Sequence, residues 1–498
     1  MAKLITTFDQ ASFGVNFLIV SPPPATPAAV TGYVGMVAAL PWGPTGVRLV
    51  SNGSELASLF MPYELDCLDT TTFPSLKALF AGIPGPLYVK NIRAADAVAA
   101  TRTFNDGSAG PSTVVTAKYA GSLGNKVSVE WVDGTTAGTQ ATAIVRIGDR
   151  YEKTYVDVVS GTTVTDPGDP FVTFSAHGSI AGRPATAAAA LLTSGSDGTA
   201  TAADWNGTSG SLGGVRDFLD SNVALENGVI FGAEVPAAIK AAFNLVIDEV
   251  AAEKGAVACL STVLNETRAS AIVTAALSGS TRTDYSGFTV DVVDEYSTAL
   301  PPAEAEMDTN AFKAAVLAKI GPQRSQGEAA LVRPFLKKIL RVNATLTDAD
   351  YELLLAGGVC APKMTKKGAV FYGGRCTNLT PSTNSLARTR VENYVRAGLN
   401  TVLEDAADIV LDVDVTRERL GASTRPYALA ATAFLDNLKN PAVGLPVISD
   451  YEIDFFASSV AQIQAGTWVI AVAVTSFSTA ERIIITLTVG PTVSTNEV

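Results

Sequence analysis

The sequence predicts a multidomain α/β (α+β) fold, with a helix-covered core sheet, an inserted all-β domain and extended arms at both termini. Helical and strand-like segments alternate from about residue 205 onward, which favours a sheet covered by helices. Short stretches between 109 and 180 alternate apolar and polar residues, which is typical of antiparallel strands. Both ends carry apolar segments that are too short to form a core of their own.

The composition of the 498-residue chain argues against two classes of partner. Lys and Arg number 36 and Asp and Glu number 48, which gives a formal net charge of −12. Because phosphate backbones and anionic lipids are bound mainly through Lys and Arg, we expect no direct nucleic-acid binding and no membrane insertion. Only 17% of the residues are charged, against roughly 25% in an ordinary soluble domain. We therefore expect partner subunits to cover much of the surface.

Residues 1–28 are predicted to form an N-terminal extended arm. Prolines between residues 22 and 27 forbid a helix and keep the backbone stretched. Asn16 interrupts the preceding apolar run, and prolines stand where a signal peptide would have its cleavage site, so this segment is predicted to be mature sequence. The strand-like part of the arm comprises Phe17, Leu18, Ile19 and Val20.

Residues 29–108 are predicted to form a small α/β domain. A strand over Tyr33–Leu40 leads into a Gly/Pro turn at Pro41–Gly46, because these residues interrupt regular structure. The other expected elements are a strand at Val47–Val50, a helix opened by Ser51 and Ser54, a helix at Ser75–Ala81 and a strand at Pro86–Ile92.

Residues 109–200 are predicted to form an inserted β-rich domain, either a sandwich or a barrel. Turns that contain Gly, Asp and Pro separate its short alternating strands. The only histidine of the sequence, His177, follows these strands, and without a second imidazole we expect it to lie in a turn or on the surface. The strands are expected at 114–119, 126–132, 143–147, 155–159 and 171–174.

Residues 201–380 are predicted to form the α/β core. Apolar residues recur along one helical face from Ile239 to Val250, and a buried strand at Ala256–Leu260 follows. Asn265 is expected to cap a helix over Glu266–Leu277. The later elements are a strand at Phe288–Val293, a helix opened by Asp308 and ending at Ile320, and a helix over Tyr351–Leu355 with a capping box of Thr347 and Asp350.

Residues 381–480 are predicted to form a C-terminal α/β domain, and residues 481–498 a C-terminal strand arm. Two amphipathic helices are expected, over 391–403 and over Tyr427–Leu438. Strands are expected at Ile448–Phe456, Thr467–Val474 and Arg482–Val489. The last strand is strongly β-forming, so it must be covered or used for pairing. Its pairing residues are Ile483, Ile484, Ile485, Thr486 and Leu487.

The motifs of common enzymes are missing from the sequence. There is no G-x-S-x-G, G-x-G-x-x-G or G-K-[ST] segment, so the usual hydrolase, dinucleotide and nucleotide sites are not expected. One histidine and four scattered cysteines argue against zinc. Acidic residues from Glu404 to Asp414 could bind Mg²⁺ or Ca²⁺, but no Gly turn gathers them, so a solvated or partner-facing patch is favoured. We expect no enzymatic activity, catalytic residue, metal or cofactor.

The N-terminal third resembles the contractile tail sheath proteins of tailed bacteriophages and related injection machines. Thr31–Gly35, Trp42–Pro44 and Gly85–Arg93 are similar to the G-x-V-G strand, the W-G-P turn and the aromatic-Val strand with which that family opens. Ala120–Asn125 is similar to the entry into the inserted domain of the family. Pro41 is an addition to the W-G-P segment.

The C-terminus carries the rest of the resemblance. Ala465–Val472 and Ser478–Ile484 are similar to the last two strands of the family, with Ser478 in place of the usual proline. Residues 205–380 match the family only as an alternating α/β pattern. The order and spacing of the motifs along the chain carry the resemblance.

The resemblance implies a structural tail sheath subunit that polymerises helically around a tail tube and contracts, driving the tube through the host envelope during DNA delivery. It implies a homo-oligomer, a helical stack of rings, whose partners are tail tube, baseplate and tail terminator proteins, in a virion tail assembled in the bacterial host cytoplasm. In the family, terminal arms add strands to the C-terminal sheets of neighbours, and the two apolar terminal runs suit that role. The expected tube-facing residues are Arg388, Glu392, Arg396 and Glu404.

Other functions are compatible with parts of the same pattern. A capsid or baseplate structural protein would also have apolar interfaces, but it would lack symmetric terminal arms. A soluble hydrolase with an unrecognised site is the rival from another class, and the missing motifs and single histidine count against it. The terminal strand could also pair within its own subunit as an internal edge strand.

Overall fold

The core of the molecule is a six-stranded sheet with the strand order β14-β13-β12-β1-β3-β2. Neighbouring strands are parallel except β2, which runs antiparallel to β3. The strands are β1 (Val34–Ala38), β2 (Arg48–Val50), β3 (Leu87–Asn91), β12 (Val229–Ala233), β13 (Val257–Cys259) and β14 (Thr283–Asp284). The computed structural model describes residues 33–40, 42–60, 87–108, 110–149, 151–178, 182–262, 266–293, 304–328, 332–334, 336–337, 339–380, 383–404, 410–441 and 445–477.

Helices cover both faces of this sheet, which explains why its central strands are buried throughout. Helices α4 (Ala237–Lys254) and α5 (Arg268–Ser278) pack on one face, where Ile230 of β12 lies beside Phe243 and Ile247. Helix α6 (Asn310–Lys319) packs on the other face with Phe231. The α/β alternation expected from the sequence is therefore confirmed.

The sheet takes strands from two segments that the sequence analysis assigned to separate domains. Strand β1 pairs with β3 on one side and with β12 on the other, so residues from 29–108 and 201–380 share one hydrogen-bonded sheet. The domain borders proposed from the sequence stay predictions.

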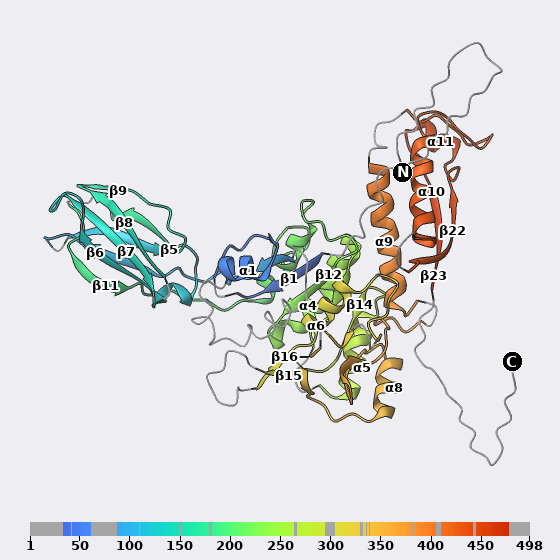
Figure 1. Cartoon of the computed structure of the whole chain (residues 1–498), viewed down its shortest axis with the longest axis horizontal. Coiled ribbons are helices and arrows are strands. Elements are labelled where there is room, and N and C mark those ends of the chain that lie inside the picture. The colour runs from blue at the N-terminus through green and yellow to red at the C-terminus, as the bar shows by residue number, and fades with distance from the viewer. Residues whose placement is uncertain are drawn as a thin grey trace, which may run out of the picture.

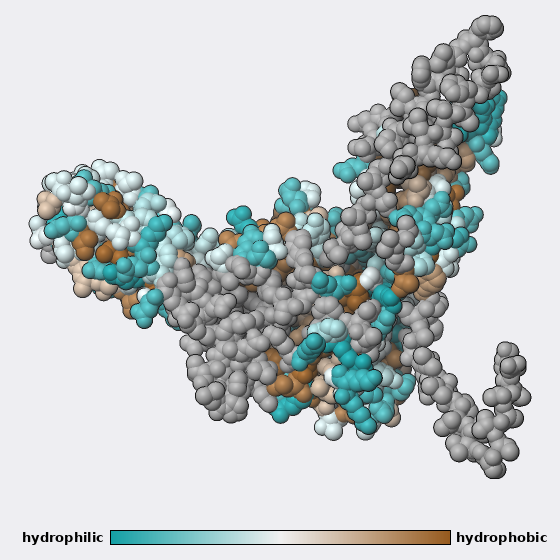
Figure 2. Space-filling view, viewed as in Figure 1, coloured by the Kyte–Doolittle hydropathy of each residue, from teal (hydrophilic) through white to brown (hydrophobic). Residues whose placement is uncertain are grey.

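Two antiparallel sheets form a β-rich unit (residues 101–191) at one end of the molecule (Figure 1). The face seen in Figure 2 is mainly hydrophilic to neutral. Inside the unit, Trp131 lies edge-on to Phe104 and Phe174, with ring centroids 5.9 and 5.8 Å away. One sheet contains β4 (Thr101–Asn105), β5 (Pro111–Ala117) and β10 (Val172–Ala176); the other contains β6 (Val127–Asp133), β7 (Gln140–Ile147), β8 (Tyr151–Ser160), β9 (Thr163–Val164) and β11 (Ala187–Leu191).

The chain enters and leaves the β-rich unit through two adjacent segments. Val98 and Ser196 exchange two backbone hydrogen bonds of 2.9 Å, and Thr101 and Thr193 pair next to them. The W-G-P turn provides a second attachment. The Trp42 ring packs on Tyr119 and Phe171 at centroid distances of 5.3 and 6.0 Å. Asn91 fixes this turn, since it accepts from Leu40 N–H and donates to the Trp42 carbonyl, both at 2.9 Å.

Smaller elements complete the fold between and around these sheets. The capping box expected for Thr347 and Asp350 is confirmed at the start of α8 (Asp348–Ala356). The cap expected from Asn265 is replaced: α5 begins at Arg268, and the Thr267 hydroxyl accepts the Ser270 N–H. The remaining elements are α1 (Gly53–Phe60), η1 (Ser122–Lys126), α3 (Ala202–Asn206), η2 (Gly214–Leu219), β15 (Val290–Val293), β16 (Glu304–Met307), β17 (Ile339–Val342), β18 (Pro362–Thr365) and β19 (Gly368–Phe371).

A C-terminal unit (residues 386–477) lies at the other end of the molecule (Figure 1). Helices α9 and α10 share an apolar cluster with a two-stranded sheet. A Cβ at Gly398 would lie 2.1 Å from a Phe434 ring carbon, so glycine permits the close approach of the two helices. The elements are α9 (Leu386–Leu403), β20 (Val413–Asp414), β21 (Arg419–Leu420), α10 (Arg425–Lys439), β22 (Ile448–Asp454), α11 (Val460–Gln464) and β23 (Ala471–Ser476).

Several expectations fall outside the described residues. These are the N-terminal arm with Phe17–Val20, the helix at Ser75–Ala81, and the C-terminal strand with Ile483–Leu487. They stay predictions.

Candidate functional site

Helix α9 presents three different faces along its length. Its exposed stripe repeats every fourth residue, as a helical face requires. A second face packs against α10, and a third packs against the core. The exposed stripe comprises Arg388, Glu392, Arg396, Asn400 and, at the C-cap, Glu404.

Part of this stripe also contacts the core of the same chain. Glu392 Oε1 lies 3.8 Å from Arg282 Nη2. The Arg396 guanidinium lies against Gly255, so closely that a Cβ at Gly255 would collide with it. Because Gly255 is the left-handed C-cap of α4, the Arg396 cation lies at the negative end of that helix. Arg388, Glu392 and Arg396 share one side of the helix, whereas Glu404 at the C-cap lies about 160° farther around the axis than Arg388. Glu392 and Arg396 also hold α9 in place.

Arg390, which the sequence analysis did not single out, anchors α9 to the core. Its Nη2 donates to the carbonyl oxygens of Leu317 (2.7 Å) and Ile320 (2.8 Å). Its Nη1 donates to Gly321 (3.3 Å) and Arg324 (3.4 Å). These carbonyls lie at and just beyond the end of α6, where backbone acceptors are unsatisfied and the helix dipole is negative.

The Arg390 guanidinium is buried, and these four hydrogen bonds all go to neutral backbone oxygens. Burial lowers the pKa of Arg390 to about 10, so the side chain remains a cation at neutral pH. Removing it would leave four carbonyls without this donor. The sequence contains a weak signal, because Arg390 adjoins Val391 on the side of the helix opposite Arg388.

The C-terminal sheet has two strands among the described residues, so its outer strand edges are unpaired there. One face packs on α9 and α10 through Tyr451, Ile453, Val472 and Val474. The other face is exposed and combines two rows of different chemistry. Strand β22 contributes Asp450, Glu452 and Asp454, and β23 contributes Ala471, Ala473 and Thr475.

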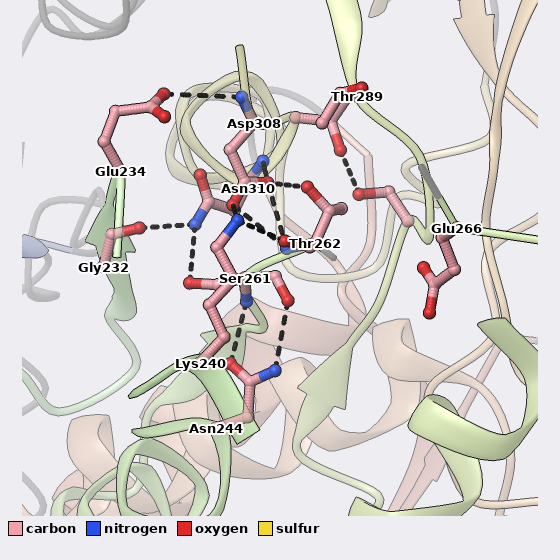
Figure 3. Close-up of polar contacts among 12 residues, drawn as sticks. Gly232, Glu234, Lys240, Asn244, Ser261, Thr262, Glu266, Thr289, Asp308 and Asn310 are labelled. Atoms are coloured by element: carbon pink, nitrogen blue, oxygen red, sulfur yellow. Dashed lines mark hydrogen bonds and ion pairs between the residues drawn. The ribbon is translucent and has the colours of Figure 1, made fainter. Parts of the chain in front are cut away.

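The carboxyl edge of the core sheet contains a dense polar network (Figure 3). The carboxylate of Asp308 accepts from Thr262 N–H at 3.0 Å and lies 3.7 Å from the Lys240 ammonium. Burial raises the pKa of Asp308, while Lys240 and the hydrogen bonds from Thr262 oppose that rise. Asp308 was expected to open the following helix; instead Thr309 is the N-cap, although Asp308 still accepts Asn310 N–H at 3.3 Å.

The same network ties the strand ends to the helices. Asn244 of α4 exchanges two hydrogen bonds with the backbone of Ser261 (2.9 and 3.1 Å). Asn310 of α6 donates to the Gly232 carbonyl and to Ser261 Oγ. Open α/β sheets commonly bind ligands at this edge, but here the polar side chains at the edge form hydrogen bonds with other groups of the same chain. The arrangement holds helices in place and does not present a nucleophile beside a general base.

A second buried charge pair joins α6 to β14. The Lys313 ammonium contacts the Asp284 carboxylate, and both side chains are buried. The ammonium also lies 4.9 Å from the centroid of the Phe371 ring. Burial raises the pKa of Asp284 and the Lys313 charge lowers it. Such a pair fixes one packing arrangement, because separating it would leave a charge without compensation.

The other residues that were singled out in the sequence lie on the surface, at a helix cap or in the core. His177 is exposed after β10. Asp412 accepts the N–H groups of Ser423 and Thr424 just before α10, so it acts as a helix cap. Cys360 and Cys376 are buried free thiols, as is Cys259. Within the described ranges, no group of three or more His, Cys, Asp or Glu residues could hold a metal ion. No helix found in those ranges is long and apolar enough to cross a bilayer.

The fold is shared with sheath proteins of contractile systems. A sheath tail protein from Listeria innocua is similar with a TM-score of 0.61 and 14% identity, covering 91% of this chain and 96% of that one. A sheath tail protein from Desulfitobacterium hafniense is similar with a TM-score of 0.60 and 13% identity, covering 94% of this chain and 100% of that one. The helical sheath of the anti-feeding prophage in its contracted state is similar with a TM-score of 0.54 and 13% identity, covering 97% of this chain and 99% of that one. No family model and no curated protein matches the sequence. The resemblance predicted from the motifs is thus confirmed in the fold.

We expect Arg390→Met to lower the free energy of unfolding by about 3 kcal/mol, because buried carbonyls lose their donor while the side-chain volume is nearly kept. Urea unfolding followed by circular dichroism measures the change. Arg388→Met, on the exposed side of the same helix, is the matched control and should change stability by less than about 1 kcal/mol. Equal effects of the two substitutions would contradict the anchoring role.

Glu266 should make stability depend on pH. Burial raises the pKa of Glu266 to about 7, although Tyr285 and Thr274 donate hydrogen bonds to its carboxylate at 2.5 and 2.9 Å. The folded chain therefore holds this proton more tightly than the unfolded chain. Its contribution is fully present below the unfolded pKa of about 4.5 and is lost as the pH rises through about 7, a change on the order of 2–3 kcal/mol.

Urea unfolding at pH 5 and pH 8 tests this expectation. Glu266→Gln keeps an acceptor for Tyr285 and removes the titration, so the variant should lose less stability between the two pH values than the wild type does. Glu253→Gln, at an exposed position of α4, should behave like the wild type. An equal loss of unfolding free energy between pH 5 and pH 8 in the wild type and in Glu266→Gln would show that Glu266 is not responsible for the pH dependence.

Proposed function

We propose that this chain is the sheath subunit of a contractile tail or injection device. The observation that carries the proposal is the likeness of fold over nearly the whole length of both chains, 91% of this one and 96% of the Listeria innocua sheath tail protein. A fold alone can serve many functions. The surface of the C-terminal unit and the composition of the termini support the same function independently.

The two-stranded C-terminal sheet is proposed to accept terminal strands from neighbouring copies. An open strand edge offers a row of backbone donors and acceptors, and a short apolar segment can add to it as a further strand. Phe17–Val20 and Ile483–Leu487 have this character. Each junction would form roughly four to six backbone hydrogen bonds at about 0.5–1.5 kcal/mol each, so a lattice of many copies is needed for strong cohesion.

Linking copies head to tail gives a helical assembly when the rotation between neighbours does not close a ring. Contraction then requires two packings of the same rigid subunits, with the strand links acting as hinges. The free energy is stored in the extended lattice during assembly, so the proposal requires no nucleotide site. The proposed partners are further copies of the chain, a tail tube, a baseplate and a tail terminator, and the proposed location is a virion tail assembled in the host cytoplasm.

The exposed stripe of α9 is proposed to face the tube. Arg388, Glu392 and Arg396 put charges of both signs on one side of the helix, and Glu404 adds a negative charge at its C-terminal end. A contact through such a stripe can be strong enough to align subunits during assembly and weak enough to break on contraction, because exposed charge pairs are screened by salt.

Electron microscopy of truncated chains tests the strand links. We expect deletion of residues 1–20, or of 480–498, to prevent helical tubes while leaving the thermal unfolding of the remaining body close to that of the full chain. Tubes of normal length from both deletions would refute the proposal. Closed shells from the full chain would indicate a capsid protein instead.

Disulfide trapping separates exchange between copies from pairing within one chain. In a Cys67→Ser background, Ala473→Cys on β23 is combined with a cysteine at position 484, 485 or 486. Oxidised assemblies should give a ladder of covalent multimers on a non-reducing gel, whereas an internal edge strand would give closed monomers. Ala473→Cys alone is the control and should give no ladder.

Reversing one charge tests the tube-facing stripe. Arg388→Glu should reduce tube-templated assembly severalfold and make the remaining assembly respond differently to NaCl between 50 and 500 mM. Arg417→Glu changes another exposed arginine of the C-terminal unit, one outside α9, and should have little effect. Unchanged assembly by Arg388→Glu would reject this orientation of the helix.

A further inference from the structure

The connection between β22 and β23 lies in an uncharged part of the sequence. No Asp, Glu, Lys, Arg or His occurs from Phe455 to Ala480, although 17% of the whole chain is charged. The same stretch contains Phe455, Phe456 and Trp468 among aliphatic residues and glutamines. Depletion of charge together with aromatic side chains is the composition of the centre of a protein interface.

This β22–β23 connection (residues 455–470) is far longer than its strands require. Asp454 pairs directly with Ala471, so two residues could close a hairpin of this kind. Instead the chain inserts α11 and a return segment, and α11 lies at the end of the C-terminal unit farthest from the core sheet (Figure 1). The hairpin itself does not need this addition, so the connection must be explained by something other than closing the turn.

The connection is held by its own hydrogen bonds. Trp468 Nε1 donates to the Phe455 carbonyl at 2.9 Å, and Val469 N–H donates to Ser458 Oγ at 2.6 Å. Ser459 and Gln462 form a complete capping box at the start of α11. A surface that is ordered before binding loses less conformational entropy when a partner covers it.

The surface of the connection is largely exposed in the part of the chain that the structure describes. Of residues 455–470, only Ser458 is buried; Val460 is 52% exposed, and the three aromatic side chains are partly exposed. Structured segments rich in aromatic and aliphatic residues are expected to bury some of them, so the exposure of this one favours a covering partner.

Charge points to another copy of the chain as that partner. Each copy carries a net charge of −12, so the overall electrostatic interaction between two copies is repulsive. A foreign partner of opposite charge would bind an acidic surface, whereas contact between equally acidic copies favours a surface without charge. Glu452 and Asp454 border the connection on β22. Repulsion between these carboxylates of two copies would disfavour contacts shifted onto that strand.

We propose that the β22–β23 connection is a docking surface for a second copy of this chain, formed by apolar and amide groups. The inference rests on the proposed sheath function, since it names a contact within that assembly. It is separate from strand addition, because it uses the side chains of the connection and not a strand edge. A contact of this kind gains strength from apolar burial, so it tolerates high salt.

The test introduces charge into the full-length chain. Val460→Glu and Ile463→Glu should each reduce the fraction of self-assembled protein in sedimentation velocity at least tenfold at equal total concentration, with the thermal unfolding midpoint of the monomer unchanged. The assembled fraction of the wild type should be the same or higher at 500 mM than at 50 mM NaCl. Leu277→Glu makes the same chemical change at an exposed position of α5, and Val460→Leu keeps the apolar surface of the connection. Both control variants should assemble like the wild type.

Each outcome has a distinct meaning. Normal self-assembly of Val460→Glu and Ile463→Glu overturns the proposal. If these variants also lose binding to a purified tube protein, the surface belongs to that partner instead. If the wild type forms small oligomers that need Val460 but never forms tubes, the sheath function fails while the docking surface stands.

Discussion

A buried cation is central to the placement of the C-terminal unit. The Arg390 guanidinium spans from α9 to the end of α6, and four backbone carbonyls accept its protons. The partners are peptide oxygens, which cannot rotate away from the cation as a carboxylate side chain can. The interaction therefore specifies both the distance and the angle at which α9 leaves the core. Arg396 against Gly255 and Glu392 beside Arg282 support the same orientation farther along the helix.

The sequence predicted the regular elements well where periodicity and capping agreed. The alternating strands of the β-rich unit and the Thr347–Asp350 capping box are examples, because both signals are local. Strand β11 was not expected: its sequence AAAAL has no strand periodicity, and it is a strand because it pairs with β6. Local patterns cannot show such pairing.

The candidate site was less predictable for the same reason. The exposed stripe of α9 follows from helical spacing, whereas the role of Arg390 depends on carbonyls some seventy positions earlier in the chain. The union of β1 and β3 with β12 likewise depends on pairing across more than a hundred residues. Asp308 shows a local signal overridden by tertiary contacts, since a residue suited to capping α6 is also bound by Thr262 and Lys240. The buried Lys313–Asp284 pair gave no sequence signal at all.

The paired connections at the base of the β-rich unit have an evolutionary consequence. Val98 and Ser196 close a backbone bridge, so the outgoing and returning chains are already side by side before the unit begins. The core sheet therefore meets the same pair of hydrogen-bonded segments whatever sequence lies between Val98 and Ser196. A lineage could exchange, enlarge or discard this module and preserve the rest of the protein, which makes it the natural place for sequence variation and for grafting foreign domains.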